Sequence, residues 1–164
     1  MLQHLKISNY ALIEKLDIDF GKGFSVITGE TGAGKSIMLG ALSLLLGGRA
    51  DAKSIKSGAS KCVVEALFNI KGLGLSAIFE EHDIDFDPEE CYIRREVTAT
   101  GKSRAFVNDT PVQVAVLKQI STRLIDIHSQ HQNLLMGEEN FLLETLDAAG
   151  ENKNLLEQYQ TAFS

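Results

Sequence analysis

The sequence predicts an α/β fold, and three features of the chain support this prediction. A β-rich run over residues 24–28 leads into a glycine-rich stretch over 29–36, and an apolar helical pattern follows it. Between residues 2 and 20, apolar side chains recur at nearly every second position, as they do in strands. Two later strand patterns are joined by a short turn over 99–102, which is typical of a β-hairpin. Together these features indicate a strand–loop–helix unit beside an antiparallel β subdomain.

The glycine-rich stretch has the complete phosphate-loop pattern G-x-x-x-x-G-K-S. Small residues let successive backbone N–H groups form an anion-binding nest, and the helix that follows adds about half a positive charge at its start. Lys35 is expected to contact the β- and γ-phosphates of ATP, and the Ser36 hydroxyl to ligate Mg²⁺. The expected nucleotide-binding residues of this stretch are Gly29, Glu30, Thr31, Gly32, Ala33, Gly34, Lys35, Ser36 and Ile37. The stretch predicts a P-loop NTPase, and the alternative is a glycine-rich turn before a helix.

Composition limits the classes of protein that the chain can represent. Its 164 residues suffice for one domain with a short extension, and its net charge of −6 argues against a protein that coats DNA, though not against local basic patches. Cys62 and Cys91 match no metal-ligand spacing and indicate reduced thiols of a cytoplasmic protein. The apolar run 42–46 is too short to span a membrane.

The N-terminal part predicts three strands before the phosphate loop. Two lie within 2–20, with a turn expected over 8–9, and the third is the run 24–28. The helix is expected to start near Gly34 and to stop at the glycine pair 47–48, which is a helix C-terminus signal.

The middle of the chain alternates basic and acidic segments. Residues 49–61 hold four basic residues against one acid and predict an exposed loop, either solvated or in contact with nucleotide or DNA phosphates. A strand over 62–70 and a short helix over 73–79 are expected next. The acidic run 80–90 is interpreted as a solvated connector, because its spacing matches no ordered set of metal ligands.

The predicted hairpin, with strands over 91–98 and 103–108, is basic. Its charged residues are Arg94, Arg95, Lys102 and Arg104, against the single acid Glu96. Such side chains either lie against nucleic acid or protect an edge strand from aggregation.

The C-terminal part begins with a helix expected at Thr110 and Pro111. A core strand is expected over 123–128, running into a polar segment over 129–133. From 138 the pattern is helical and still open at the last residue, as at the start of a longer coiled-coil helix.

A complete ATPase needs a carboxylate at the end of a second buried strand. Residues 77–81 and 124–126 each resemble a buried strand that ends in a carboxylate. The first segment is helix-like, however, and the apolar run of the second is short. No L-S-G-G-Q-type signature is present. The sequence therefore predicts one half of an ATPase site, which alone binds nucleotide weakly or turns it over poorly.

The chain resembles the N-terminus of the RecN family, the bacterial SMC-like ATPases of DNA double-strand-break repair. The resemblance covers nearly the whole chain in order, and the most specific parts are E-T-G-A-G-K-S and I-H-x-Q-H. The segments that carry it are 7–13, 29–36, 46–51, 93–96, 103–108 and 126–131.

The resemblance implies a P-loop NTPase fold, with residues 1–150 as the N-terminal half of an ABC/SMC-type ATPase head and 151–164 as the root of a coiled-coil helix. The Mg²⁺-binding and catalytic carboxylates and the signature would lie in a C-terminal half outside this chain. Two heads would sandwich ATP in a homodimer, and DNA, as duplex, ends or single-stranded overhangs, would be the partner. The resemblance also implies a cytoplasmic, nucleoid-associated protein.

Two further site residues follow from the resemblance. Gln130 matches the glutamine that reaches Mg²⁺ and the attacking water, which makes it a catalytic candidate beside Lys35. Arg49 matches an arginine loop that approaches nucleotide or DNA. Ser129 and Gln132 stand where the family has Gly and Glu, which changes the surroundings of Gln130.

Three alternatives remain open at this stage. The first is a related DNA-processing head, such as RecF or another SMC-like ATPase. RecF has no long coiled coil, so the sequence after residue 164 would separate a RecF-like head from a RecN-like one. A self-contained P-loop kinase would need a complete active site within these residues. A pure binding module would hold its nucleotide as a structural ligand.

Overall fold

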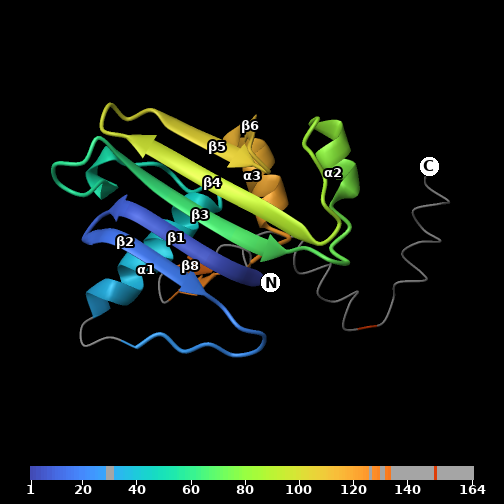
Figure 1. Ribbon diagram of the computed structural model, residues 1–164, viewed down its shortest axis with the longest axis horizontal. Helices are drawn as coiled ribbons and strands as arrows, with labels where there is room; N and C mark the ends of the chain where they lie inside the picture. The colour runs from blue at the N-terminus through green and yellow to red at the C-terminus, as the bar shows by residue number, and fades with distance from the viewer. Residues whose placement is uncertain (29–31, 126, 130–131, 134–149, 151–164) are drawn as a thin grey trace. The chain divides into compact units, whose positions relative to one another are not determined.

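The computed structural model describes residues 1–28, 32–125, 127–129, 132–133 and 150. The chain divides into two compact units, Met1–Asp126 and Ile127–Ser164, and each is considered by itself. The first unit contains a six-stranded sheet with the order β2-β1-β3-β4-β5-β6, in which every neighbouring pair is antiparallel (Figure 1). The strands are β1 (Leu2–Tyr10), β2 (Ile13–Asp19), β3 (Lys61–Asn69), β4 (Glu90–Thr98), β5 (Ser103–Val107) and β6 (Thr110–Val112).

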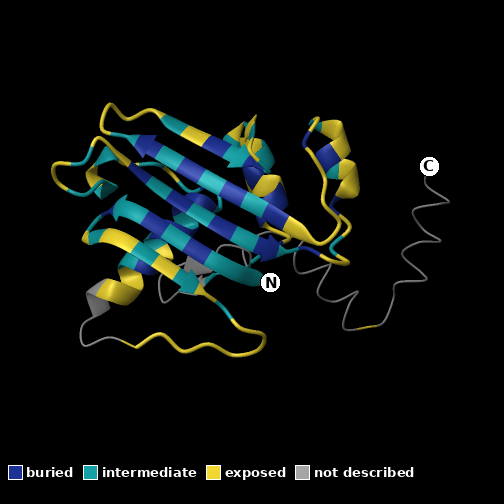
Figure 2. Ribbon diagram, in the orientation of Figure 1, coloured by how far each residue is buried: buried dark blue, intermediate teal, exposed yellow. Residues whose placement is uncertain are grey.

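One face of this sheet is the core of the unit. Along β3 and β4 every second residue is buried, as expected of a sheet with one covered face (Figure 2). The covering helices are α1 (Gly32–Leu45), which contacts β1, β3 and β4, and α3 (Val114–Ser121), which contacts β5. A short helix, α2 (Ser76–Glu81), lies in the β3–β4 connection and buries Phe79, and a 3₁₀ turn, η1 (Ala52–Ser54), follows α1.

The end of α1 is fixed by a glycine cap. Gly47 has φ of +92°, Gly48 N–H donates to the Ser43 carbonyl and Gly47 N–H donates to the Leu44 carbonyl. This is the Schellman arrangement, in which a glycine in the left-handed region satisfies the last carbonyls of a helix. The predicted stop at the glycine pair is confirmed.

Two predictions for the N-terminal part were wrong. The turn between β1 and β2 lies at Ala11 and Leu12, three residues later than expected, with Ala11 at φ of +49°. The predicted strand 24–28 is not found among the described residues, where this run pairs with no strand of the sheet. Strand propensity alone does not make a strand when no neighbouring strand offers hydrogen bonds.

The segment after the hairpin also differs from its prediction. Residues 110–112 form β6, an edge strand paired with β5, and the helix starts only at Val114. Pro111 is tolerated there because an edge strand has one side without ladder hydrogen bonds. The predicted short helix 73–79 is found as α2, which begins three residues later and ends two residues later than predicted.

The expected core strand 123–128 is not formed over its described residues in the first unit. Thr122, Arg123 and Leu124 continue α3 as a turn, since their N–H groups donate to the carbonyls of Lys118, Ile120 and Ser121 respectively. In the second unit the structure describes β7 (His128–Ser129) paired with β8 (Gln132–Asn133). Asp126, Gln130 and the predicted C-terminal helix, including 151–164, lie outside the described residues. Within the described part of the chain, no helix has the length and apolar character needed to cross a membrane.

Candidate nucleotide-binding site

The phosphate-loop motif leads directly into α1. Gly29, Glu30 and Thr31 lie outside the described residues, while Gly32 and Ala33 begin the helix. Gly34, Lys35 and Ser36 are exposed in its first turn, and Ile37 is half-buried. Because the first N–H groups of a helix have no partner within the helix, the exposed turn presents backbone donors beside the Lys35 ammonium and the Ser36 hydroxyl.

The rest of α1 holds this turn in place. Met38, Ala41 and Leu45 lie on one side of the helix and are 7%, 0% and 0% exposed. Their spacing of three and four residues is that of a helix face, which here packs on the sheet. The first turn of α1, which carries the end of the phosphate-loop motif, is therefore held in place by a helix that packs in the core.

Space for a ligand is available at the first turn. A Cβ atom built on Gly34 would meet no heavy atom within 4 Å, so the backbone there is open to approach. A backbone that phosphate oxygens can approach closely, followed by a lysine and a hydroxyl residue, fits ATP with Mg²⁺.

The segment that enters the motif is exposed. Phe24, Val26 and Ile27 are 93%, 68% and 47% exposed, although the sequence there is strongly apolar. The described sheet provides no partner for them. An apolar, strand-like run with unpaired backbone is a surface suited to pairing with further strands.

Arg49 lies beyond the other end of α1. The helix rises about 1.5 Å per residue over Gly32–Leu45, so Arg49 follows an end about 20 Å from the motif. Its side chain is exposed. The structure therefore does not bring Arg49 together with Lys35 along α1.

The basic hairpin is only partly as predicted, and Arg95 is a correction. Arg95 is 2% exposed and cannot belong to an exposed basic surface. The reason is the strand alternation, because Cys91, Ile93, Arg95 and Val97 share the buried face of β4. The alternation of apolar residues at 91, 93 and 97 is visible in the sequence and predicts that Arg95 is buried. A count of the charged residues alone misses this.

The other three hairpin bases differ among themselves. The Arg94 guanidinium lies 4.3 Å from the Phe106 ring centre and is within 3.7 Å of an Asp109 carboxylate oxygen, so its charge is partly compensated. Lys102 and Arg104 are exposed, and neither forms an ion pair among the described residues. The basic surface of the hairpin thus reduces to Lys102 and Arg104.

The positive charge of the loop after α1, residues 49–61, is partly compensated by neighbouring carboxylates. Lys56 hydrogen-bonds Glu14, and the Lys61 ammonium lies 3.7 Å from a Glu96 carboxylate oxygen. Ile55 forms an isolated bridge with Tyr10, which ties the loop to β1. Lys53 and Arg49 remain exposed.

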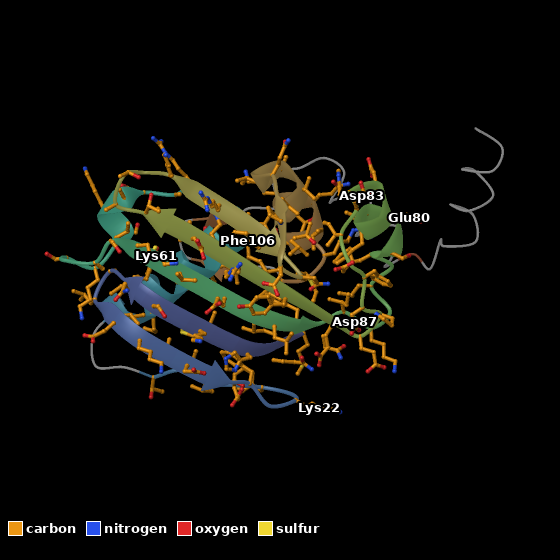
Figure 3. All side chains as sticks on the ribbon, turned by 45° about the horizontal axis from the view of Figure 1, so that its top comes forward. Lys22, Lys61, Glu80, Asp83, Asp87 and Phe106 are labelled. Atoms are coloured by element: carbon orange, nitrogen blue, oxygen red, sulfur yellow. The ribbon has the colours of Figure 1, made fainter. Side chains whose placement is uncertain are left out.

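The acidic run gathers at the end of the sheet away from Lys61, where Glu80, Asp83 and Asp87 are seen (Figure 3). No group of three or more His, Cys, Asp or Glu side chains suited to a metal ion is present in the part of the chain that is described. The interpretation of this run as a connector agrees with its mostly exposed residues.

The sequence contains two segments, 77–81 and 124–126, that resemble a buried strand ending in a catalytic carboxylate. Residues 77–81 lie in α2 and Leu124 lies in a turn, so neither described segment is the buried strand that such a site requires.

Cys62 and Cys91 are both buried and free. Burial raises the pKa of Cys91 to about 12 and also raises the pKa of Cys62.

Comparison with known proteins gives one family model and many relatives. The model, described as an AAA domain, matches residues 4–164. DNA repair protein RecN of Vibrio cholerae is 38% identical over 163 residues, covering 99% of this chain and 29% of the relative. DNA repair protein RecN of Bacillus subtilis is 40% identical over 166 residues, again covering 99% of this chain and 29% of the relative. The chain thus spans less than a third of the length of these relatives.

Solved structures give the fold. A structure described under ATP-driven dimerization and DNA-stimulated activation of SMC ATPases matches with a TM-score of 0.62 at 23% identity, covering 96% of this chain and 97% of the other. The recombination mediator protein RecF matches with a TM-score of 0.56 at 21% identity, covering 71% of this chain and 29% of the other. The first unit thus has the fold of the N-terminal lobe of a P-loop NTPase head, with an antiparallel sheet, as the sequence predicts.

Proposed function

The chain belongs to the AAA domain family, and from this premise we propose that it is the ATP-binding N-terminal lobe of a RecN-like ATPase head that acts in DNA double-strand-break repair. The observation that carries the proposal is the exposed first turn of α1, with Gly34, Lys35 and Ser36 at the end of a helix anchored in the core. The identity of 38–40% with two RecN proteins supports the choice within the family.

The roles of the site residues follow from their chemistry. The backbone N–H groups of the motif and the start of α1 bind phosphate oxygens, and Lys35 neutralises charge on the β- and γ-phosphates. The Ser36 hydroxyl is the proposed Mg²⁺ ligand from this chain, and Mg²⁺ when bound neutralises phosphate charge. Gln130 and Arg49 are proposed to act near the metal and near nucleotide or DNA, respectively.

Hydrolysis is proposed to need a second half of the head. The described residues contain no buried strand that ends in a carboxylate at 77–81 or at Leu124. The exposed apolar run with Phe24 and Val26 supports the addition of further strands beside the motif. We propose that a C-terminal head segment supplies these strands and that two completed heads dimerise around ATP.

DNA is the proposed macromolecular partner, in a cytoplasmic, nucleoid-associated protein. Lys102 and Arg104 are exposed and form no ion pair with any described residue, and they are the proposed contacts of the hairpin with phosphate. The buried Arg95 is excluded from this surface, and Arg94 contributes less because Asp109 and Glu96 lie close to it. A RecF-like head is the second candidate, which the RecF fold match favours.

The proposal is tested by equilibrium binding of a fluorescent ATP analogue to the chain, with and without Mg²⁺. Lys35→Ala is expected to abolish binding in both conditions, whereas Ser36→Ala removes only the gain that Mg²⁺ provides. Lys53→Ala, which removes an exposed lysine of the η1 turn, is the matched control and keeps wild-type affinity. Equal binding by wild type and Lys35→Ala refutes the assignment of the phosphate site.

A further inference from the structure

A buried arginine, Arg95, lies beside a cavity on the helix-covered side of the sheet. Arg95 is only 2% exposed, and its buried Nε and Nη1 atoms have no hydrogen-bond partner among the described residues. Burial lowers the pKa of this guanidinium, yet an arginine remains charged in proteins. A buried charge without a counter-charge costs several kcal/mol, so its presence calls for a ligand.

A second donor lines the same cavity. The cavity has a volume of about 510 Å³ and lies between β5, β6 and the start of α3. The Ser103 hydroxyl that lines it is also buried and has no hydrogen-bond partner in the part of the chain that the structure describes. Register places Arg95 opposite Ala105 and Ser103 opposite Val97, so both donors come from adjacent positions on the buried face. Two orphan donors thus face one space.

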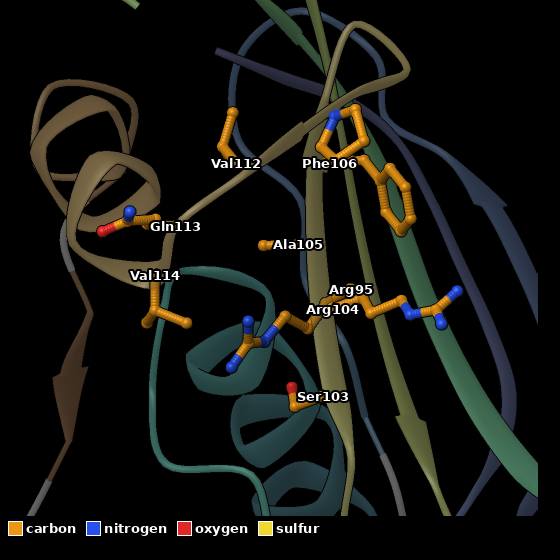
Figure 4. Close-up of a pocket in the computed structure, with 9 residues that line it drawn as sticks. Arg95, Ser103, Arg104, Ala105, Phe106, Val112, Gln113 and Val114 are labelled. Carbon is orange, nitrogen blue, oxygen red and sulfur yellow. The ribbon is translucent and has the colours of Figure 1, made fainter.

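Arg104, on the neighbouring strand β5, differs from Arg95 in its direction and exposure. Arg95 and Arg104 extend from the sheet in opposite directions (Figure 4). Arg104 is exposed on the side of Phe106, whereas Arg95 is buried on the side of Ala105. Only one of the two charges is therefore held away from water.

We propose that Arg95 and Ser103 form a binding site for an aliphatic carboxylate. Arg104 also lines the cavity but is exposed, so Arg95 supplies the one buried positive charge. A single buried charge matches a monoanion, whereas a phosphate dianion would leave a negative charge unmatched in the cavity. The remaining walls include Ala105, Val112 and Val114, which suit a hydrocarbon chain rather than water. A carboxylate of this kind is present in small aliphatic acids and in glutamate side chains of polypeptides.

The test follows the Nε–Hε NMR signal of Arg95 in the ¹⁵N-labelled chain. Butyrate and the α-amide of N-acetylglutamate are the two carboxylate probes, and neutral butyramide and inorganic phosphate are the controls. Both carboxylates are expected to shift the signal saturably, and butyramide is not. Tighter binding of the glutamate derivative identifies a polypeptide source, and tighter binding of butyrate identifies a free acid. No saturable shift with either carboxylate, or a larger effect of phosphate or butyramide, overturns the proposal.

Thermal unfolding with butyrate gives an independent readout. Arg95→Met removes an unpaired charge and is expected to unfold at the same or a higher temperature than wild type without ligand. Butyrate raises the unfolding temperature of wild type and of the control Arg123→Met, which removes an exposed arginine, but not that of Arg95→Met. A strong destabilisation by Arg95→Met, with no effect of butyrate on wild type, assigns Arg95 a structural role and contradicts the site.

Discussion

Gly40 of α1 faces the hydroxyl of Tyr10 on β1 so closely that a Cβ atom at position 40 would lie 2.8 Å from that oxygen. Tyr10 is 8% exposed and its hydroxyl hydrogen-bonds Ser54, so the ring cannot move aside easily. Burial accordingly raises the pKa of Tyr10. This contact sets the distance between the sheet and the helix that presents the phosphate motif.

Gly40→Ala is therefore expected to destabilise the fold. The overlap costs about 1–3 kcal/mol, which exceeds the gain of about 1 kcal/mol from replacing a helical glycine. Denaturant unfolding of Gly40→Ala, Tyr10→Phe and the double variant measures the coupling between the two positions. We expect the double variant to be more stable than the sum of the single effects, since Phe removes the clashing oxygen. Additive effects would show that the contact does not limit the packing.

Gly34→Ala is expected to separate binding from stability. The added methyl group meets no atom within 4 Å, so the free energy of unfolding stays the same or rises slightly. It occupies space that phosphate oxygens need, so ATP binding weakens at least tenfold. Binding titration and denaturant unfolding on the same sample check both statements. Unchanged affinity would place the phosphates elsewhere.

Much of this architecture could be predicted from the sequence because it is local. The alternation in β3 and β4, the glycine cap at Gly47 and the start of α1 each depend on neighbouring residues. The absent strand 24–28 could not be predicted, because a strand requires a hydrogen-bonding neighbour that the described sheet does not offer. The helix start at Thr110 was wrong since the pairing with β5 overrides the signal of Pro111.

The candidate site shows the same division. The motif predicts Lys35 and Ser36 as phosphate and Mg²⁺ contacts, and the structure places both residues, exposed, in the first turn of α1. The charge count of the hairpin misplaced Arg95, since a count ignores which face of the strand each side chain occupies. The close contact between Gly40 and Tyr10 is formed by residues thirty positions apart, so no local sequence pattern predicts it.

Replacing Lys102 and Arg104 by alanine is expected to weaken DNA binding and reduce its salt dependence. Each lost phosphate contact lowers the slope of log affinity against log salt by about 0.9. Fluorescence anisotropy with linear duplex DNA at several salt concentrations measures the slope for the full-length protein. Lys22→Ala, which removes an exposed lysine near a distant turn (Figure 3), is the control. An unchanged slope removes the hairpin from the DNA surface.

The buried thiol of Cys91 predicts a loss of stability at alkaline pH. Its pKa is about 12 in the fold against 9.0 without burial, so the unfolded chain releases this proton first. The stabilisation is complete below about pH 9 and is lost as pH rises towards 12. Unfolding temperatures between pH 8 and 10.5 should fall less in Cys91→Ala than in wild type. Parallel profiles would show that the thiol ionises equally in both states.

ATP turnover by the chain mixed with a RecN C-terminal head segment, with linear DNA present, tests the central claim most directly. The chain alone and the segment alone are expected to be nearly inactive, and the wild-type mixture to hydrolyse ATP. The Lys35→Ala mixture is expected to remain at background, with its fold unchanged by circular dichroism. Full turnover by the chain alone, or by the Lys35→Ala mixture, would contradict the account of one phosphate site completed by a second half.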